Sequence, residues 1–172
     1  MFIKRDANTR SSDIAFMGIM LAINQILLYF AGIMSFNETI FLGLASVIIG
    51  IVIIEKGIKN GIVFYISSAM MGAVLMPNKL NALGYIFVLG LYTVVKYYIE
   101  KSGEIKKEVI TKAVYFFIIS LAAAIAGSKF IYASSAIIIL PMFVLIMAVY
   151  DYSATVILTA YIKNLGGNLK KG

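Results

Sequence analysis

Six long apolar stretches, separated by short breaks that carry charge, Gly, Pro or Asn, run through the 172-residue chain. They cover Ile14–Met34, Thr39–Ile54, Gly61–Met76, Ala82–Ile99, Val109–Gly127 and Ala133–Ile162. A helix needs about 20 apolar residues to cross a bilayer, so the second and third stretches need a turn from their flanks. The sequence therefore predicts an all-α, polytopic membrane protein, in which residues 1–172 form one bundle of six transmembrane helices.

Composition supports this prediction and excludes several chemistries. Hydrophobic residues make up 62% of the chain and charged residues 13%, about half the charged share of soluble domains. The chain has no Cys and no His, which excludes zinc sites, thiol or histidine nucleophiles and disulfides. No second carboxylate accompanies Asp151 within the apolar stretches, so paired-acid chemistry lacks its parts. We expect no metal, no cofactor and no enzymatic activity.

Basic residues fix the expected orientation. If the N-terminus is cytoplasmic, every Lys and Arg except Lys79 and Lys129 falls on the cytoplasmic side of the six stretches. This asymmetry follows the positive-inside rule and predicts that both termini are cytoplasmic. The same rule accounts for the net charge of +7, so we expect no nucleic-acid partner.

The first stretch carries small residues at helix-packing spacing. Ala15, Gly18 and Ala22 lie on one face of a helix, and small residues let helix backbones approach closely in lipid. They predict a docking face for the transmembrane helices of a partner protein. Packing within a single bundle is the alternative.

Two ionisable residues lie near the cytoplasmic ends of their stretches. Asp151 falls between two tyrosines in the sixth stretch, and Lys96 lies at a similar depth in the fourth. Charges inside a membrane are costly and are usually paired, so the sequence predicts an ion pair between them. Asp151 is either half of such a structural pair or the carrier of a proton or cation.

Polar side chains predict where a ligand binds. Asn24 and Gln25 are adjacent at mid-depth in the first stretch, and both should face the bundle, toward a ligand or a neighbouring helix. More polar and aromatic residues gather near the outer ends of the helices, where they would form a pocket or solvate loops. The candidate ligand-binding residues are Asn24, Gln25, Asn37, Glu38, Tyr65, Asn78, Lys79, Asn81, Tyr85, Lys129 and Tyr132.

These features resemble the substrate-binding S component of an energy-coupling-factor (ECF) vitamin transporter. The resemblance rests on the sequence AFMGIMLA at 15–22, NALGYIFVLGLYTVVKYYIEK at 81–101 and VYDYSATVILTAYIKNL at 149–165. The last two segments look like those of small uncharacterised membrane proteins of Firmicutes that are often grouped with S components. The first-span motif of the family is Ala-x-x-x-Ala, and here Gly18 replaces the first Ala.

The resemblance implies a subunit of the bacterial cytoplasmic membrane that captures a vitamin or related micronutrient near its outer face. It also implies docking through the first span to a transmembrane coupling subunit, which a pair of cytoplasmic ATPases drives. The chain itself has no P-loop pattern, which fits an external source of energy. It also has no Trp, the residue that stacks thiamine-like rings in some members of the family.

Two other functions also fit the sequence. The chain could be a structural protein of a cell-envelope or cell-shape complex, with the loop Lys101–Lys112 as its cytoplasmic contact. It could also be a self-sufficient ion-coupled transporter of a small molecule, in which Asp151 carries the ion.

Overall fold

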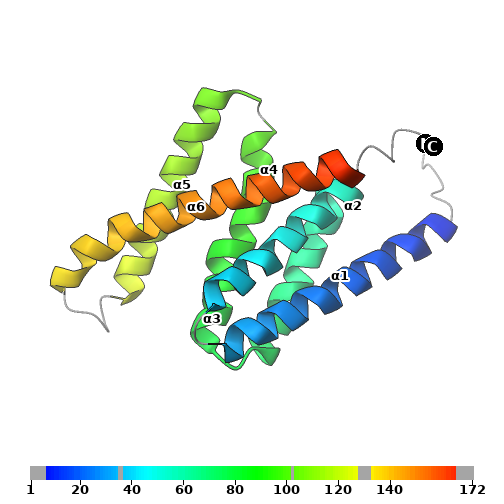
Figure 1. Cartoon of the computed structure of the whole chain (residues 1–172), viewed down its shortest axis with the longest axis horizontal. Coiled ribbons are helices and arrows are strands. Elements are labelled where there is room, and N and C mark those ends of the chain that lie inside the picture. Colours follow the sequence, from blue (N-terminus) through cyan, green and yellow to red (C-terminus); the bar gives the residue numbers. More distant parts are fainter. Residues whose placement is uncertain (1–6, 35–36, 102, 128–132, 166–172) are drawn as a thin grey trace. The chain divides into compact units, whose positions relative to one another are not determined.

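The computed structural model describes the backbone of residues 7–34, 37–101, 103–127 and 133–165, and side chains in most of these ranges (Figure 1). The elements are α1 (Ala7–Ile33), α2 (Glu38–Leu75), α3 (Lys79–Gly84), the π-helix η1 (Tyr85–Gly90), α4 (Leu91–Glu100), α5 (Ile105–Gly127) and α6 (Ala133–Leu165). No strand occurs in these ranges, so the all-α prediction is confirmed for them.

Four helical segments of the described chain are long and apolar enough to cross a membrane. They are Ser11–Ile33, Glu38–Leu75, Lys79–Glu100 and Pro141–Asn164. Helices satisfy their own backbone hydrogen bonds, which is what a segment must do in hydrocarbon. Several such segments in one chain indicate a multi-pass membrane protein.

The helices group into two compact units, Met1–Val95 and Lys96–Gly172. In the first unit α1 packs against α2, and α3 and η1 pack against α2 as well. Its core contains the buried side chains of Leu28, Ile49 and Phe64. In the second unit α5 packs against α6.

Gly57 divides α2 into two arms, residues 38–56 and 58–75. Its backbone has φ 81° and ψ 165°, a conformation that residues with a Cβ rarely adopt. The chain reverses direction there. The two arms lie against the same residue of α1, since Asn24 bonds to Ala45 in one arm and to Ser68 in the other. The two arms correspond to the second and third predicted stretches. The break predicted between these stretches, at the charged residues around Gly57, is where the chain reverses.

Replacing Gly57 with Ala should destabilise the first unit by about 1–3 kcal/mol, the usual cost of holding a non-Gly residue in this backbone region. Gly84→Ala is the matched control, because Gly84 has helical φ and ψ angles and a Cβ there meets no described atom within 4 Å. Alanine at that position should be neutral or stabilise by up to about 1 kcal/mol. Reversible unfolding in mixed micelles measures both variants, and equal effects would contradict the assignment of the reversal to Gly57.

The helix that follows α3 departs from the uninterrupted span expected over Ala82–Ile99. Residues 85–90 form a π-helix, whose i to i+5 bonding inserts an extra residue and rotates the side chains that follow. Tyr65 donates its hydroxyl hydrogen to the Ile86 carbonyl oxygen at 2.7 Å, which satisfies a backbone acceptor in this segment. A Cβ at Gly90 would lie 2.9 Å from Cε2 of the Tyr65 ring, so glycine makes room for that ring.

The helix α6 runs without interruption from Ala133 to Leu165, and Pro141 lies inside it (Figure 1). Proline lacks an N–H and removes one backbone hydrogen bond from the preceding turn. Between residues 141 and 164 most of the large apolar side chains of α6 are exposed, and Met147 and Ala154 are the buried ones. This exposure fits a helix whose surroundings are largely hydrocarbon.

Candidate functional site

Three neutral side chains from three helices meet in a ring inside the first unit. Asn24 comes from α1, Ser68 from the second arm of α2 and Tyr85 from η1, and all three are fully buried. Ser68 Oγ donates to Asn24 Oδ1 at 2.6 Å, and Asn24 Nδ2 donates to the Tyr85 hydroxyl at 3.1 Å. The third side of the ring joins Ser68 Oγ and the Tyr85 hydroxyl oxygen at 2.7 Å. We call these three residues the polar ring.

The hydrogens of the polar ring run in one direction. A serine hydroxyl has one hydrogen, and that of Ser68 is used on Asn24 Oδ1. The Tyr85 hydroxyl must therefore donate to Ser68 Oγ. The second hydrogen of Asn24 Nδ2 goes to the Ala45 carbonyl oxygen at 2.7 Å, which ties the ring to the first arm of α2. In a low-dielectric interior such a closed chain of bonds strengthens each member.

Gln25 lies beside the polar ring and is less completely bonded. Its Nε2 donates to the Ser68 carbonyl oxygen at 3.2 Å and, more weakly, to Asn24 Oδ1 at 3.4 Å. The side chain is 8% exposed, and its Oε1 has no hydrogen-bond partner among the described residues. A buried acceptor without a donor costs free energy, so Gln25 Oε1 is the atom of this site that still requires a hydrogen-bond donor.

The sequence places these residues through the periodicity of α1. Among residues 11–33 of this helix, the buried ones are Asn24, Gln25, Leu28 and Ala31, and their spacing puts them on one face. The sequence predicted that Asn24 and Gln25 face inward. Ser68 was missed, because a single serine in an apolar helix gives no signal of the helix it will contact.

Most of the other predicted ligand-binding residues lie at helix ends. Asn81 Nδ2 donates to Glu38 Oε2 at 2.7 Å and to the Ala31 carbonyl oxygen at 3.2 Å, so these two residues do come together. Lys79 Nζ caps the end of α2, donating to the carbonyl oxygens of Ala73, Val74 and Met76.

The remaining candidates do not join Glu38 and Asn81. Asn78 caps the start of α3 by accepting from the backbone N–H groups of Leu80 and Asn81. The Asn37 side chain is exposed just before α2 and makes no capping bond there. Tyr65 is committed to the Ile86 carbonyl oxygen. Lys129 and Tyr132 lie outside the described residues.

A second cluster, which we call the ion-pair network, lies in the second unit. The predicted pair forms, because Lys96 Nζ bonds to Asp151 Oδ1. Lys96 also pairs with Glu100 at 2.6 Å and donates to the Thr155 hydroxyl at 2.7 Å. The Lys96 side chain is 4% exposed, so its charge is almost completely removed from solvent.

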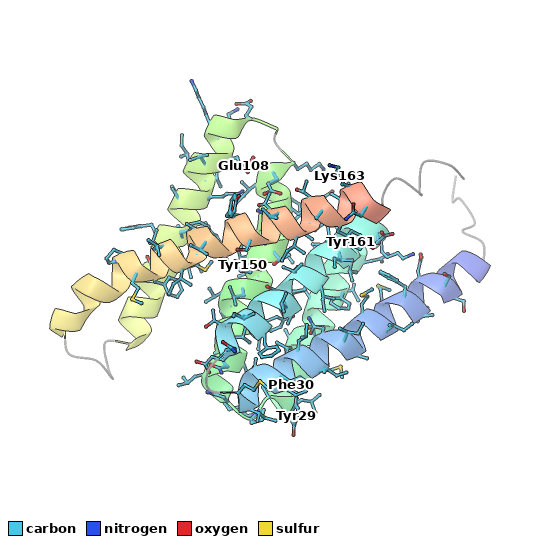
Figure 2. All side chains as sticks on the ribbon, viewed as in Figure 1. Tyr29, Phe30, Glu108, Tyr150, Tyr161 and Lys163 are labelled. Atoms are coloured by element: carbon cyan, nitrogen blue, oxygen red, sulfur yellow. The ribbon has the colours of Figure 1, made fainter. Side chains whose placement is uncertain are left out.

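Lys112 joins the network from α5. Its Nζ lies 2.7 Å from Glu108, 3.0 Å from Glu100 and 3.1 Å from Asp151 Oδ2 (Figure 2 labels Glu108 on α5). The network thus holds two lysines and three carboxylates from α4, α5 and α6. An ion pair was not predicted for Lys112, Glu100 or Glu108, although the i, i+4 spacing of Lys96–Glu100 and Glu108–Lys112 was a usable signal. Each carboxylate oxygen of Asp151 contacts a lysine, Oδ1 that of Lys96 and Oδ2 that of Lys112.

Comparison with known proteins adds no relationship. No protein-family model, no curated protein and no solved structure matches this chain.

Proposed function

We propose that this protein is the substrate-binding membrane subunit of an ECF-type, ATP-driven importer for a vitamin or related micronutrient. It would reside in the bacterial cytoplasmic membrane, bind the small molecule itself and draw energy from a coupling subunit with a pair of ATPases. The observation that carries the proposal is the contrast between two parts of α1. Asn24 and Gln25 are buried, whereas Ala15, Gly18 and Ala22, in the preceding turns of the same helix, are exposed on the surface.

The small-residue face of α1 is open. Ala15, Gly18 and Ala22 are exposed, and a Cβ at Gly18 would meet no described atom within 4 Å. Large apolar side chains flank it, with Ile14 and Ile19 each more than 60% exposed. In lipid, small residues promote association because they let two backbones approach closely. A face of this kind that the first unit leaves unpacked supports docking of a helix from another protein.

Six crossings with both termini in the cytoplasm are part of the proposal. The reversal at Gly57 supports counting α2 as two crossings, and α1, the run 79–100, α5 and α6 supply the others. Asp13, near the start of α1, pairs with Lys56 at the Gly57 reversal at 2.7 Å, which supports placing both on one side. Lys163 at the C-terminal end of α6 fits a cytoplasmic end as well (Figure 2).

Gly18→Leu should abolish partner docking, because a leucine side chain separates the backbones that the small residues bring together. We expect at least about a tenfold loss of the co-purifying coupling subunit and ATPases in a mild-detergent pull-down from native membranes, a change that corresponds to about 1.4 kcal/mol. Ligand binding by the isolated subunit should persist, since Gly18 is exposed and lies about two helical turns before the buried Asn24 and Gln25.

Ala73→Leu is the control for added bulk, because Ala73 is exposed on α2 away from the small-residue face. It should co-purify with the partners as the wild type does. An unchanged complex with Gly18→Leu would refute the docking face. Recovery of cell-shape or division proteins would favour a structural role. An ion-coupled transporter would take up substrate without partner proteins, and its uptake would be lost with Asp151→Asn and on addition of an uncoupler.

A further inference from the structure

The open acceptor at Gln25 specifies the chemistry of what binds beside the polar ring. Gln25 is the single glutamine of the chain, its side chain is more than nine-tenths buried, and its Nε2 is oriented by the Ser68 carbonyl oxygen. That orientation fixes Oε1 as the atom left over, because Nε2 is the only donor of the amide. The side chain is therefore held in place with a buried acceptor that has no donor among the described residues.

The hydrogen-bond donors of the polar ring are already committed. Both hydrogens of Asn24 Nδ2 are used, on Ala45 and Tyr85, and the Ser68 hydroxyl donates to Asn24. The Tyr85 hydroxyl completes the ring by donating to Ser68. A donor for Gln25 Oε1 would have to come from outside this set, or the ring would have to open and leave another atom unsatisfied.

The groups that contact the Gln25 amide are neutral. The polar ring and Gln25 are uncharged, and several charged side chains of this unit are engaged elsewhere: Lys56 with Asp13, Lys79 with the end of α2, and Glu38 with Asn81. A buried charge without a counter-charge is strongly unfavourable in a membrane interior. The part of a ligand that reaches Gln25 should therefore be uncharged.

The π-helix gives an independent indication of a site. Residues 85–90 give up regular α-helical bonding, and this segment begins at Tyr85, a member of the polar ring. Single π turns occur frequently at functional sites, where they redirect a side chain that a regular helix would place elsewhere. Here the π turn begins at the tyrosine that closes the ring.

We infer that Gln25 Oε1 is the hydrogen-bond acceptor for an uncharged small molecule that carries an N–H or O–H donor. The inference rests on the proposed function and narrows its substrate class. It excludes ligands whose buried end is a carboxylate, a phosphate or an ammonium group, and also ligands whose buried end only accepts hydrogen bonds.

Because Gln25 is the only glutamine, labelling glutamine with ¹³C at Cδ gives a one-residue signal. The probe is a small-molecule extract of the native cells, divided by ion exchange into neutral, anionic and cationic fractions. The neutral fraction should shift the Gln25 carbonyl resonance of the wild-type protein in detergent and raise its melting temperature. The charged fractions should do neither.

Gln25→Met removes the acceptor at similar volume and should weaken binding of the active neutral component by about tenfold, as expected for one lost hydrogen bond. Ile26→Met is the control, because Ile26 is exposed on the other side of α1 and should respond like the wild type. The inference fails if only a charged fraction acts, if no fraction acts, or if Gln25→Met binds as tightly as the wild type.

Different results would contradict the importer proposal and the inference about the ligand class. If partner proteins co-purify but no fraction shifts the Gln25 carbonyl resonance, the importer proposal stands and the inferred ligand class is wrong. A neutral ligand that binds through Gln25, together with a pull-down from native membranes that recovers no coupling subunit and no ATPase, would leave the ligand class standing and overturn the importer proposal.

Discussion

Replacing Lys96 with Met should destabilise the second unit by about 3 kcal/mol, the low end of the cost of removing one partner from a buried ion pair. Lys96 is almost completely buried and contacts Asp151 and Glu100 directly. Without it, Lys112 is the remaining lysine of a network that holds three carboxylates. The low end is appropriate because Lys112 still contacts Asp151 and Glu100, and Glu100 is partly exposed to solvent. Reversible unfolding in mixed micelles measures the change.

Lys107→Met is the matched control, because Lys107 pairs only with Glu104 in the described part of the chain and both side chains are largely exposed. Its effect should stay within about 0.5 kcal/mol, as is usual for an exposed pair. The double variant Lys96→Met with Asp151→Leu should recover part of the loss, because it removes both partners together. Equal destabilisation by Lys96→Met and Lys107→Met would show that the network does not stabilise the unit.

The second large effect is expected at Asn24. Asn24→Leu removes the bonds to Ala45, Tyr85 and Ser68 at once and leaves a buried carbonyl and hydroxyl groups without their partner. Hydrogen bonds between membrane helices are worth about 0.6 kcal/mol on average, and an unsatisfied buried group costs about 1–3 kcal/mol. Together these values give about 2–3 kcal/mol of destabilisation, measured by unfolding in micelles.

Asn60→Leu is the control for loss of a single amide bond, because Asn60 is half-buried and donates to one carbonyl oxygen, that of Lys56, across the Gly57 reversal. It should cost about 0.5–1.5 kcal/mol, less than Asn24→Leu, because one hydrogen bond is lost instead of several. Ser68→Ala and Tyr85→Phe should each cost less than Asn24→Leu, and their double variant should cost less than the sum, since the first substitution already opens the ring. Additive effects would contradict a closed ring.

The sequence determined the helices and the faces they bury. Apolar stretches broken by charged or Gly-bearing segments become helices because a backbone in hydrocarbon must satisfy its own hydrogen bonds. Asn24 and Gln25 turn inward because an amide in contact with lipid is costly, and Lys96 finds Asp151 because a buried charge requires a partner. These outcomes depend on the local sequence and on the solvent around it, and both can be inferred from the amino-acid sequence alone.

Only the tertiary structure decided which side chains from different helices meet. The rotation of one helix against its neighbour and its shift along the axis are set by packing of whole surfaces, and no spacing within a single stretch encodes them. For that reason Ser68 and Tyr85 could not be assigned to Asn24, and the π turn that presents Tyr85 left no signal in the sequence. Lys112 likewise joined Asp151 from another helix, through a contact that depends on how α5 and α6 pack.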